Sequence, residues 1–153
     1  MKKTIISSLF CVLFLLTVQH EVRAQSYRTA AGLFIDAGDG TTFVGPHIKH
    51  FFSASNAGQA MILFAGRTTI IGAEYSYNQP IAGAPGLTWN VGVGPQLAIR
   101  RENSDFYIRP LAGLEFKIPS APLAFGLDWR PAWDVSNSYF TAGRFGVAFK
   151  FTF

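Results

Sequence analysis

The sequence predicts an all-β protein: an eight-stranded, antiparallel, up-and-down transmembrane β-barrel that follows a cleaved N-terminal signal peptide. The first observation concerns composition: 49% of the 153 residues are hydrophobic and only 14% are charged. Soluble globular domains, in comparison, carry roughly one quarter charged residues. The second is a combined richness in glycine and aromatic residues, with 15 Gly and 15 Phe, which is typical of β-barrels. The third is the alternation of apolar with polar or small residues in eight segments, the pattern of transmembrane β-strands.

The N-terminal residues have the three parts of a secretory signal peptide. The chain begins with Met-Lys-Lys, continues without a charge as far as His20, and has small side chains at the cleavage-site positions before Gln25. The strongly apolar stretch, residues 5–18, is shorter than the roughly 20 residues that a membrane-spanning helix needs. We therefore expect residues 1–24 to be removed and residues 25–153 to form one barrel domain.

The charge balance and the cysteine content exclude several classes of function. Part of the formal net charge of +4 comes from basic residues of the predicted signal peptide, so the charge gives no argument for nucleic-acid binding. The single cysteine, Cys11, also lies in that signal. The exported chain is therefore expected to have no disulfide, no thiolate metal site and no cysteine nucleophile, and no cofactor is implied.

The first four predicted strands alternate less regularly than the last four. The third of them, around Ala60–Ala65, is apolar on both faces, which leaves its register open. Short stretches rich in Gly, Pro, Asn or Ser separate all eight segments. In chain order, the predicted strands cover residues 27–36, 42–52, 59–67, 68–77, 87–99, 108–117, 123–130 and 144–153.

In the last four segments, polar and small residues fall together on one of two faces. In residues 87–93, Leu, Trp, Val and Val alternate with Thr, Asn and Gly, and residues 108–117 set Ile, Ala, Leu and Phe against Arg, Gly, Glu and Lys. Residues 123–130 alternate Leu, Phe, Leu and Trp with Ala, Gly, Asp and Arg. In residues 144–153, one Val and four Phe share a face, and Arg, Gly, Ala, Lys and Thr share the other. Such a period of two predicts strands that separate two different environments.

Residue types on the two faces indicate that the apolar face points outward. The polar face is rich in Gly and Ala, which suit the narrow interior of an eight-stranded barrel. If both chain ends are periplasmic, the aromatic residues of the apolar face gather at the strand ends, as in the interfacial girdle of a membrane barrel. The predicted girdle contains Tyr27, Phe52, Tyr75, Tyr77, Trp89, Phe116, Phe125, Phe151 and Phe153 at the periplasmic side, with Trp129 and Trp133 at the opposite side.

Four prolines lie inside predicted strands, where each removes a backbone hydrogen bond. Pro46, Pro95, Pro110 and Pro131 all fall toward the extracellular ends of their strands in this topology. We therefore expect an irregular or bulged extracellular rim, with the lipid-spanning band toward the periplasmic half.

Charged residues of both signs share the inward face. Isolated charges in a narrow interior are costly, so these residues should pair across strands and plug the lumen. The alternative is a gated pore in which pairing partners exchange, although eight strands leave room for side chains or one small ligand rather than for an open channel. The predicted lumen network consists of Lys49, Glu74, Arg109, Glu115, Lys117, Asp128, Arg130, Arg144 and Lys150.

The whole chain after the signal resembles the small eight-stranded outer-membrane β-barrel proteins, the class that includes the OmpA-like transmembrane domain and OmpX-like barrels. The resemblance rests on the signal, the eight alternating segments, the aromatic residues 145–153, and phrases such as Trp89–Gly94 and Gly126–Pro131. It implies an outer-membrane location, a monomer surrounded by lipid, and recognition of the last strand by the barrel-assembly machinery. Unlike the extracellular loops of that class, no loop here is longer than residues 78–86, so loop-borne adhesion or receptor functions are not expected. The resemblance implies an assembly signal at Phe149, Phe151 and Phe153.

The sequence gives little support for catalysis. His47 and His50 have opposite parity on their strand, which argues against a shared metal site, and Ser53 follows His50 with no acidic residue nearby. We expect a non-enzymatic barrel with a mainly structural or membrane-integrity role. A gated small-solute channel is the main alternative, and a soluble periplasmic or secreted ligand-binding barrel is the third.

Overall fold

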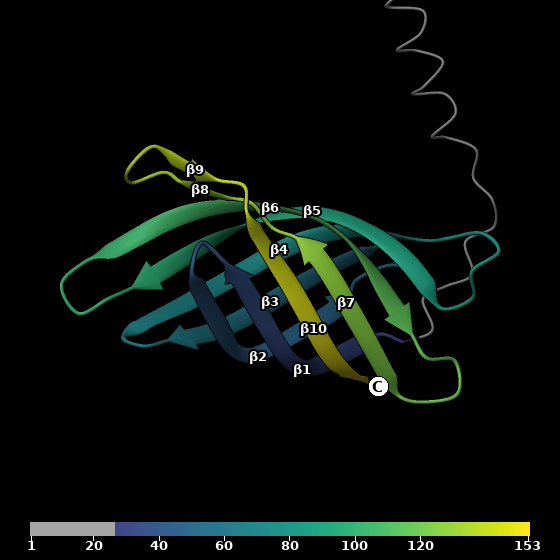
Figure 1. The fold of residues 1–153 in the computed structure, drawn as a ribbon. Helices are drawn as coiled ribbons and strands as arrows, with labels where there is room; N and C mark the ends of the chain where they lie inside the picture. The colour runs from purple at the N-terminus through teal and green to yellow at the C-terminus, as the bar shows by residue number, and fades with distance from the viewer. Residues whose placement is uncertain (1–26) are drawn as a thin grey trace, which may run out of the picture.

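The structure is a computed structural model that describes residues 27–153, so the predicted signal peptide lies outside the described residues. Ten strands make up one continuous sheet (Figure 1). Within the described part of the chain, no helix is long and apolar enough to cross a membrane. The strands are β1 (Thr29–Gly38), β2 (Thr41–Phe51), β3 (Asn56–Ala65), β4 (Thr68–Pro80), β5 (Leu87–Ile99), β6 (Ser104–Lys117), β7 (Leu123–Trp129), β8 (Ala132–Asp134), β9 (Tyr139–Thr141) and β10 (Arg144–Thr152).

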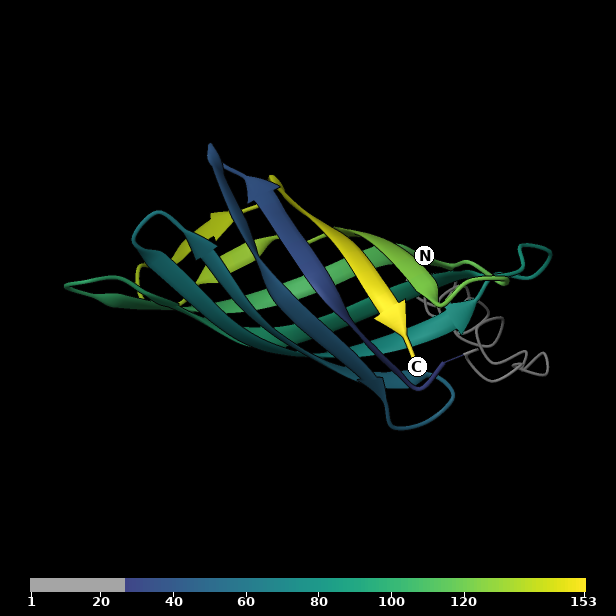
Figure 2. The ribbon, with the colours of Figure 1, turned by 90° about the horizontal axis from the view of Figure 1, so that it is seen from below.

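Eight of these strands close into a ring. Strands β1 to β7 pair antiparallel with their neighbours in the sequence, and β10 pairs with β7 on one side and with β1 on the other. Leu33 of β1, for example, lies opposite Phe149 of β10. The predicted all-β fold and the closed, eight-stranded antiparallel barrel are therefore confirmed, and Figure 2 shows the ring closed by β1 and β10.

The two ends of the barrel differ. One end, here called the terminal end, carries the start of β1 and the close of β10, where Thr29 and Phe153 exchange backbone hydrogen bonds of 3.0 and 2.8 Å. The opposite end, the hairpin end, carries the turns of the β1–β2, β3–β4 and β5–β6 hairpins. The β5–β6 hairpin projects furthest from the ring (Figure 2), because β5 and β6 are long strands of 13 and 14 residues. Strand β6 begins at Ser104, four residues before the start that the sequence pattern predicts.

The remaining two strands form a ribbon at the hairpin end. Strand β8 continues the line of β7 and pairs with β6, and β9 pairs with β8 outside the ring (Figure 1). Between Trp129 and Ala132 the ladder to β6 is interrupted, at the position of Pro131. The expected irregular rim occurs here. Two other ladders are interrupted at a proline, since Pro46 lacks a ladder partner in β3 and Pro95 lacks one in β4. Pro110 pairs with Val93 of β5, and the register is unchanged across each interruption.

The structure settles the register of the third strand. Ala60, Ile62 and Phe64 point outward, whereas Met61 and Leu63 are 2% and 0% exposed inside the barrel. Burial alternates in the same way along β4, β5 and β7. The sequence alone could not choose between the two registers, because both faces of this strand are apolar.

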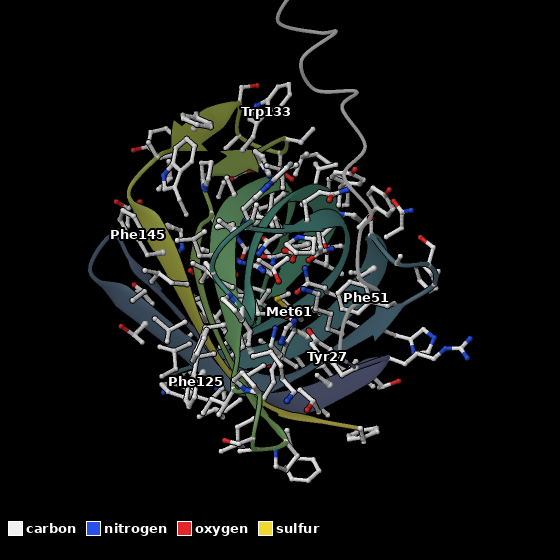
Figure 3. The ribbon with its side chains drawn as sticks, turned by 90° about the vertical axis from the view of Figure 1, so that its right-hand side faces the viewer. Tyr27, Phe51, Met61, Phe125, Trp133 and Phe145 are labelled. Atoms are coloured by element: carbon white, nitrogen blue, oxygen red, sulfur yellow. The ribbon has the colours of Figure 1, made fainter. Side chains whose placement is uncertain are left out.

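The barrel carries its polar side chains inside and its large apolar side chains outside. Glu74, Arg109 and Lys150 are at most 5% exposed, whereas Leu127 on the outer face is 57% exposed. In Figure 3, Met61 lies within the ring of strands and Phe125, Phe145 and Trp133 lie on its outer side. The interior is not wholly polar, since Phe34, Met61, Leu63, Ile70, Ala98 and Ala148 form a buried apolar cluster there.

Candidate functional site

The interior near the terminal end is organised around one carboxylate. One carboxylate oxygen of Glu115, in β6, forms ion pairs with two ammonium groups. The Lys49 nitrogen, from β2, lies 3.0 Å from this oxygen, and the second group belongs to Lys150 of β10. The hydroxyl of Tyr27 donates to the other carboxylate oxygen of Glu115. Lys49 also donates to the side-chain oxygen of Asn78 at 2.7 Å. This cluster, the Glu115 network, joins four strands and Tyr27, which lies two residues before β1, and it contains two cations for one anion.

A second cluster occupies the middle of the barrel and centres on Arg130. Its guanidinium donates to both carboxylate oxygens of Glu74, at 2.6 Å each, and to Asp128 at 3.2 Å. The Arg130 side chain is fully buried, and its guanidinium carbon lies 4.5 Å from the centre of the Phe34 ring. A buried guanidinium with a bidentate carboxylate partner and an aromatic face is held in one orientation.

Two further arginines share one aspartate toward the hairpin end. Arg109 of β6 lies 2.8 Å from one oxygen of Asp36, and Arg144 of β10 lies 3.1 Å from the other. Arg109 also donates to the side-chain oxygen of Gln96 at 3.0 Å, and Gln96 donates to Glu74 at 3.2 Å. These contacts link Asp36 to the Arg130 cluster. Together they form the arginine network, in which three arginines balance Asp36, Glu74 and Asp128.

Arg109 also fills the gap in the ladder between β6 and β7. Its guanidinium donates to the carbonyl oxygens of Arg130, at 2.6 Å, and Pro131, at 3.2 Å. These two carbonyls lie at the interruption that separates β7 from β8. Buried carbonyl groups need hydrogen-bond partners. The side chain of Arg109 therefore replaces, from inside the barrel, the backbone hydrogen bonds that the ladder lacks at this point.

An aromatic pair closes the Glu115 network at the terminal end. The rings of Tyr27 and Phe51 meet edge to face at 5.3 Å and pack with Ala30 and Ala57 in a small buried cluster. Tyr27 is 7% exposed. Its assignment to the outer aromatic girdle is therefore wrong. The alternation of faces fails at this position, because Tyr27 precedes the first ladder pair of β1 and is free to turn inward.

Lys117 also lies elsewhere than the sequence pattern indicates. Its ammonium group donates to the carbonyl oxygens of Ile118 and Ala121 in the β6–β7 turn, at 2.7 Å each. Among residues 27–153 it makes no ion pair. The parity of Lys117 places it on the inner face, but it lies too near the rim of the barrel to reach an interior carboxylate. The other eight charged residues of the predicted network belong to the two clusters.

Asp36 is a charged interior residue that the sequence pattern missed. It is fully buried and contacts two arginines. A signal was present, because Asp36 has the parity of Ala30 and Gly32 on the same strand. Phe34 lies between them on that face and hides the alternation. His47 and Gln59 were also missed; they share a buried hydrogen bond of 3.0 Å.

The remaining aromatic residues of the predicted girdle lie on the outer face. Their exposed fractions range from 37% for Tyr77 and Trp89 to 67% for Phe52. Phe149 stacks edge to face on Phe125, with ring centres 5.5 Å apart, and Phe151 lies beside Phe153 at 6.3 Å. The outward-facing members are Phe52, Tyr75, Tyr77, Trp89, Phe116, Phe125, Trp129, Trp133, Phe151 and Phe153.

The interior charged groups are arranged as ion pairs that cross the lumen. In the described part of the chain, no three His, Cys, Asp or Glu side chains come together as a metal site would require. His47 points into the barrel and stacks near Phe34, whereas His50 bonds Thr29 on the other face. Charged groups bond one another across the lumen, and their hydrogen-bonding capacity is used inside the barrel.

Comparison of the chain with protein-family models gives no match, and a search of curated proteins finds no similar sequence.

Proposed function

We propose that this chain is an integral outer-membrane β-barrel protein whose charge-filled interior has no catalytic role and whose task is mainly structural, in support of membrane integrity. One observation carries the proposal: the distribution of side chains is inverted relative to a water-soluble protein. Arg130, Lys49 and Asp36 are at most 1% exposed, whereas Phe64, Phe145 and Leu127 are more than half exposed.

Physical chemistry favours lipid as the surroundings of that outer face. Burial of apolar surface contributes roughly 25 cal/mol per Å², so a continuous belt of large apolar side chains around the barrel is unfavourable in water and favourable in hydrocarbon. Soluble monomers rarely expose apolar patches beyond a few hundred Å². A soluble ligand-binding barrel would need the reverse arrangement, with its apolar side chains lining the interior.

Three further features support a spanning role in the outer membrane. Closure of the ring leaves no unpaired strand edge among β1 to β7 and β10, as a barrel in hydrocarbon requires. Aromatic residues such as Trp89 and Phe125 are exposed on the outer face, where they suit the membrane interface. The predicted signal peptide supplies export. Outer-membrane lipids would surround the barrel, which we take to be a monomer, and the assembly machinery would read the strand that ends at Phe153.

Fractionation tests the proposal directly. The protein should remain in the outer-membrane fraction during carbonate washing, enter solution only with detergent, and migrate differently on a gel before and after boiling. A carbonate-soluble protein without a heat-dependent shift would contradict it and would favour the soluble ligand-binding barrel.

A gated small-solute channel is the second candidate, and the arrangement of Arg109 favours it. This guanidinium donates to Asp36, Gln96 and two backbone carbonyls at once. It could therefore break its bond with one acceptor during opening and still keep hydrogen bonds to the others. Single-channel recording in planar bilayers distinguishes the candidates. The structural plug predicts no conductance from the wild-type protein, whereas a gated channel predicts discrete openings that Arg109→Met alters.

A further inference from the structure

The apolar belt on the outer face differs in height around the barrel. On one side, which we call the tall wall, β5, β6 and β7 with β8 present apolar residues along almost their full length. In β5 every outward residue from Leu87 to Ile99 is apolar, and in β6 the same holds from Phe106 to Phe116. Trp133 extends this face onto the ribbon.

The opposite side, the thin wall, is formed by β1 to β4 and has a much shorter apolar stretch. In β2 the outward apolar residues run only from Val44 to Ile48, between Thr42 and His50. In β4 the stretch from Ile71 to Tyr77 is bounded by Thr69 and Gln79.

The thin wall is bordered by polar residues at the hairpin end and by polar and aromatic residues at the terminal end. At the hairpin end, the turns carry the exposed charged residues Asp39 and Arg67. At the terminal end, His50 shares a hydrogen bond of 2.9 Å with Thr29 on the outer face, and its ring centre lies 5.7 Å from that of the exposed Phe52. Polar side chains and interfacial aromatic rings at these borders suit contact with lipid headgroups and water immediately above and below the apolar stretch.

Strand geometry converts these stretches into heights. With a rise of about 3.3 Å per residue and strands tilted by about 35–45°, the apolar stretch of β5 spans about 30 Å along the barrel axis. By the same geometry, the apolar stretches of β2 and β4 span only about 10–15 Å. The apolar band of outer-membrane barrels is about 25 Å tall, so the tall wall matches a bilayer and the thin wall does not.

We propose that the bilayer is locally thinned along the thin wall, so that this wall is a lipid-contacting surface adapted to a membrane thinner than the one beside β5 to β8. The inference rests on the proposed function, because it requires the barrel to span a membrane. Tilting the barrel cannot remove the mismatch, since tilt moves each wall relative to the bilayer without making the thin wall taller. Short apolar stretches are accommodated by thinning of the lipid, at modest cost per Å.

The centre of the thin wall carries small and aliphatic side chains. Ala60 of β3 lies opposite Ile48 on one side and Ala73 on the other, all on the outer face. This surface offers no large aromatic anchor at its centre, which a protein interface would use for affinity. The exposed aromatic side chains of this wall lie toward its two borders: Phe64 in the row of Val44, Tyr75 in the row of His50, and Phe52 and Tyr77 beyond that row.

Depth measurement with fluorescent labels tests the thinning. Single cysteines are introduced at Thr42 on the thin wall, at Leu97 toward the same end of the tall wall, and at Leu127 in the middle of the belt. Cys11→Ser is included in each variant so that the label has one site. The labelled proteins are purified from the outer membrane and reconstituted into phosphatidylcholine vesicles with oleoyl chains. Quenching is measured with lipids brominated in mid-chain and with aqueous iodide.

The Leu97→Cys label should be quenched several-fold more by brominated lipid than by iodide, and the Thr42→Cys label should show the reverse. Equal protection of both labels from iodide would indicate a flat bilayer and would overturn the thinning while leaving the proposed function intact. A Thr42→Cys label shielded from both quenchers would show a protein contact on the thin wall, which also overturns it.

The Leu127→Cys label separates these outcomes from failure of the proposed function. Its strong quenching by brominated lipid shows that the barrel spans the bilayer; absence of that quenching would overturn both proposals. If Thr42→Cys or Leu97→Cys does not assemble, Thr69→Cys and Phe106→Cys provide a second pair on the same two walls. In vesicles with lauroyl chains, the contrast between the two walls should shrink, because a thinner bilayer leaves less of a step between them.

Discussion

Arg130 and Glu74 form a fully buried, two-pronged ion pair across the barrel, with one guanidinium nitrogen 2.6 Å from each carboxylate oxygen. The pair joins the end of β7 to β4, which are not neighbours in the ring. It therefore braces the barrel through its interior, whereas the strand ladders act only between adjacent strands.

Removal of Arg130 should be strongly destabilising. Arg130→Met leaves Glu74 and Asp128 buried without their cation, so the free energy of unfolding should fall by about 3–5 kcal/mol. Urea unfolding of the folded barrel in detergent, followed by tryptophan fluorescence, measures the change. The double variant Arg130→Met with Glu74→Leu should recover much of the loss, because it removes a carboxylate that would otherwise remain unpaired.

The matched control for Arg130 is an ion pair near solvent. Arg100 pairs with Asp105 at the hairpin end, where the Arg100 side chain is 42% exposed. Arg100→Met should change the free energy of unfolding by less than about 1 kcal/mol. Equal effects of the two substitutions would show that the interior pair does not brace the barrel.

The hydroxyl of Tyr27 should contribute to stability through Glu115. Tyr27→Phe keeps the ring that packs on Phe51 and removes only the donor to the carboxylate. Hydrogen bonds to charged groups contribute roughly 1.5–3 kcal/mol, and we expect a loss in that range by urea unfolding. Tyr75→Phe is the control, since the Tyr75 hydroxyl bonds Asn56 on the exposed outer face and should affect stability little.

Glycine at position 113 should be required by close packing inside the barrel. A methyl group there would collide with the side chain of Asp128 and with the backbone of the neighbouring strand at Leu127. Overpacking of this kind costs roughly 1–3 kcal/mol, so Gly113→Ala should lower the denaturation midpoint. Gly143→Ala, where a methyl group meets no atom within 4 Å, should leave the midpoint unchanged.

Alternation predicted the eight strands of the ring and the faces that most of them present; the third strand is the exception, because both of its faces are apolar. The pattern of residues 145–153 gives the outward face of β10, because a ladder forces successive side chains to opposite sides. That rule ends where the ladder ends. Tyr27 precedes β1 and turns inward, and Pro131 interrupts pairing, so the β8–β9 ribbon could not be expected from a period of two.

Partner choice inside the barrel could not be predicted from the sequence for a different reason. The inward parity of Glu74 and Arg130 follows from their strands, but their contact depends on the register of every strand between them around the ring. Asp36 shows a second limit, because the large apolar Phe34 occupies the same inner face and conceals the polar pattern. Apolar residues fill space between the charged clusters, and composition does not distinguish them from lipid-facing ones.

A charge placed on the outer face should separate a membrane barrel from a soluble one. Leu127 is 57% exposed in the middle of β7, and Leu127→Arg should cost about 2–4 kcal/mol if hydrocarbon surrounds it. The Leu127→Arg variant should therefore give less heat-modifiable protein in the outer membrane than the wild type. Tyr139→Arg on the β8–β9 ribbon, where Tyr139 is 64% exposed, should be tolerated. Equal tolerance of both arginines would argue for water around the barrel.

Phe153 should act in assembly through both its backbone and its ring, and three variants distinguish the two contributions. Its amide and carbonyl bond Thr29 at 2.8 and 3.0 Å, so deletion of Phe153 removes backbone bonds at the seam between β10 and β1 as well as an exposed aromatic ring. Phe153→Ala retains the backbone bonds, and Phe153→Trp retains an aromatic ring. The yield of heat-modifiable protein in the outer membrane should therefore be close to wild type for Phe153→Trp, lower for Phe153→Ala and lowest for the deletion. A deletion that assembles as well as the wild type would contradict the role of this residue in assembly, whereas equal losses for the alanine variant and the deletion would assign that role to the ring alone.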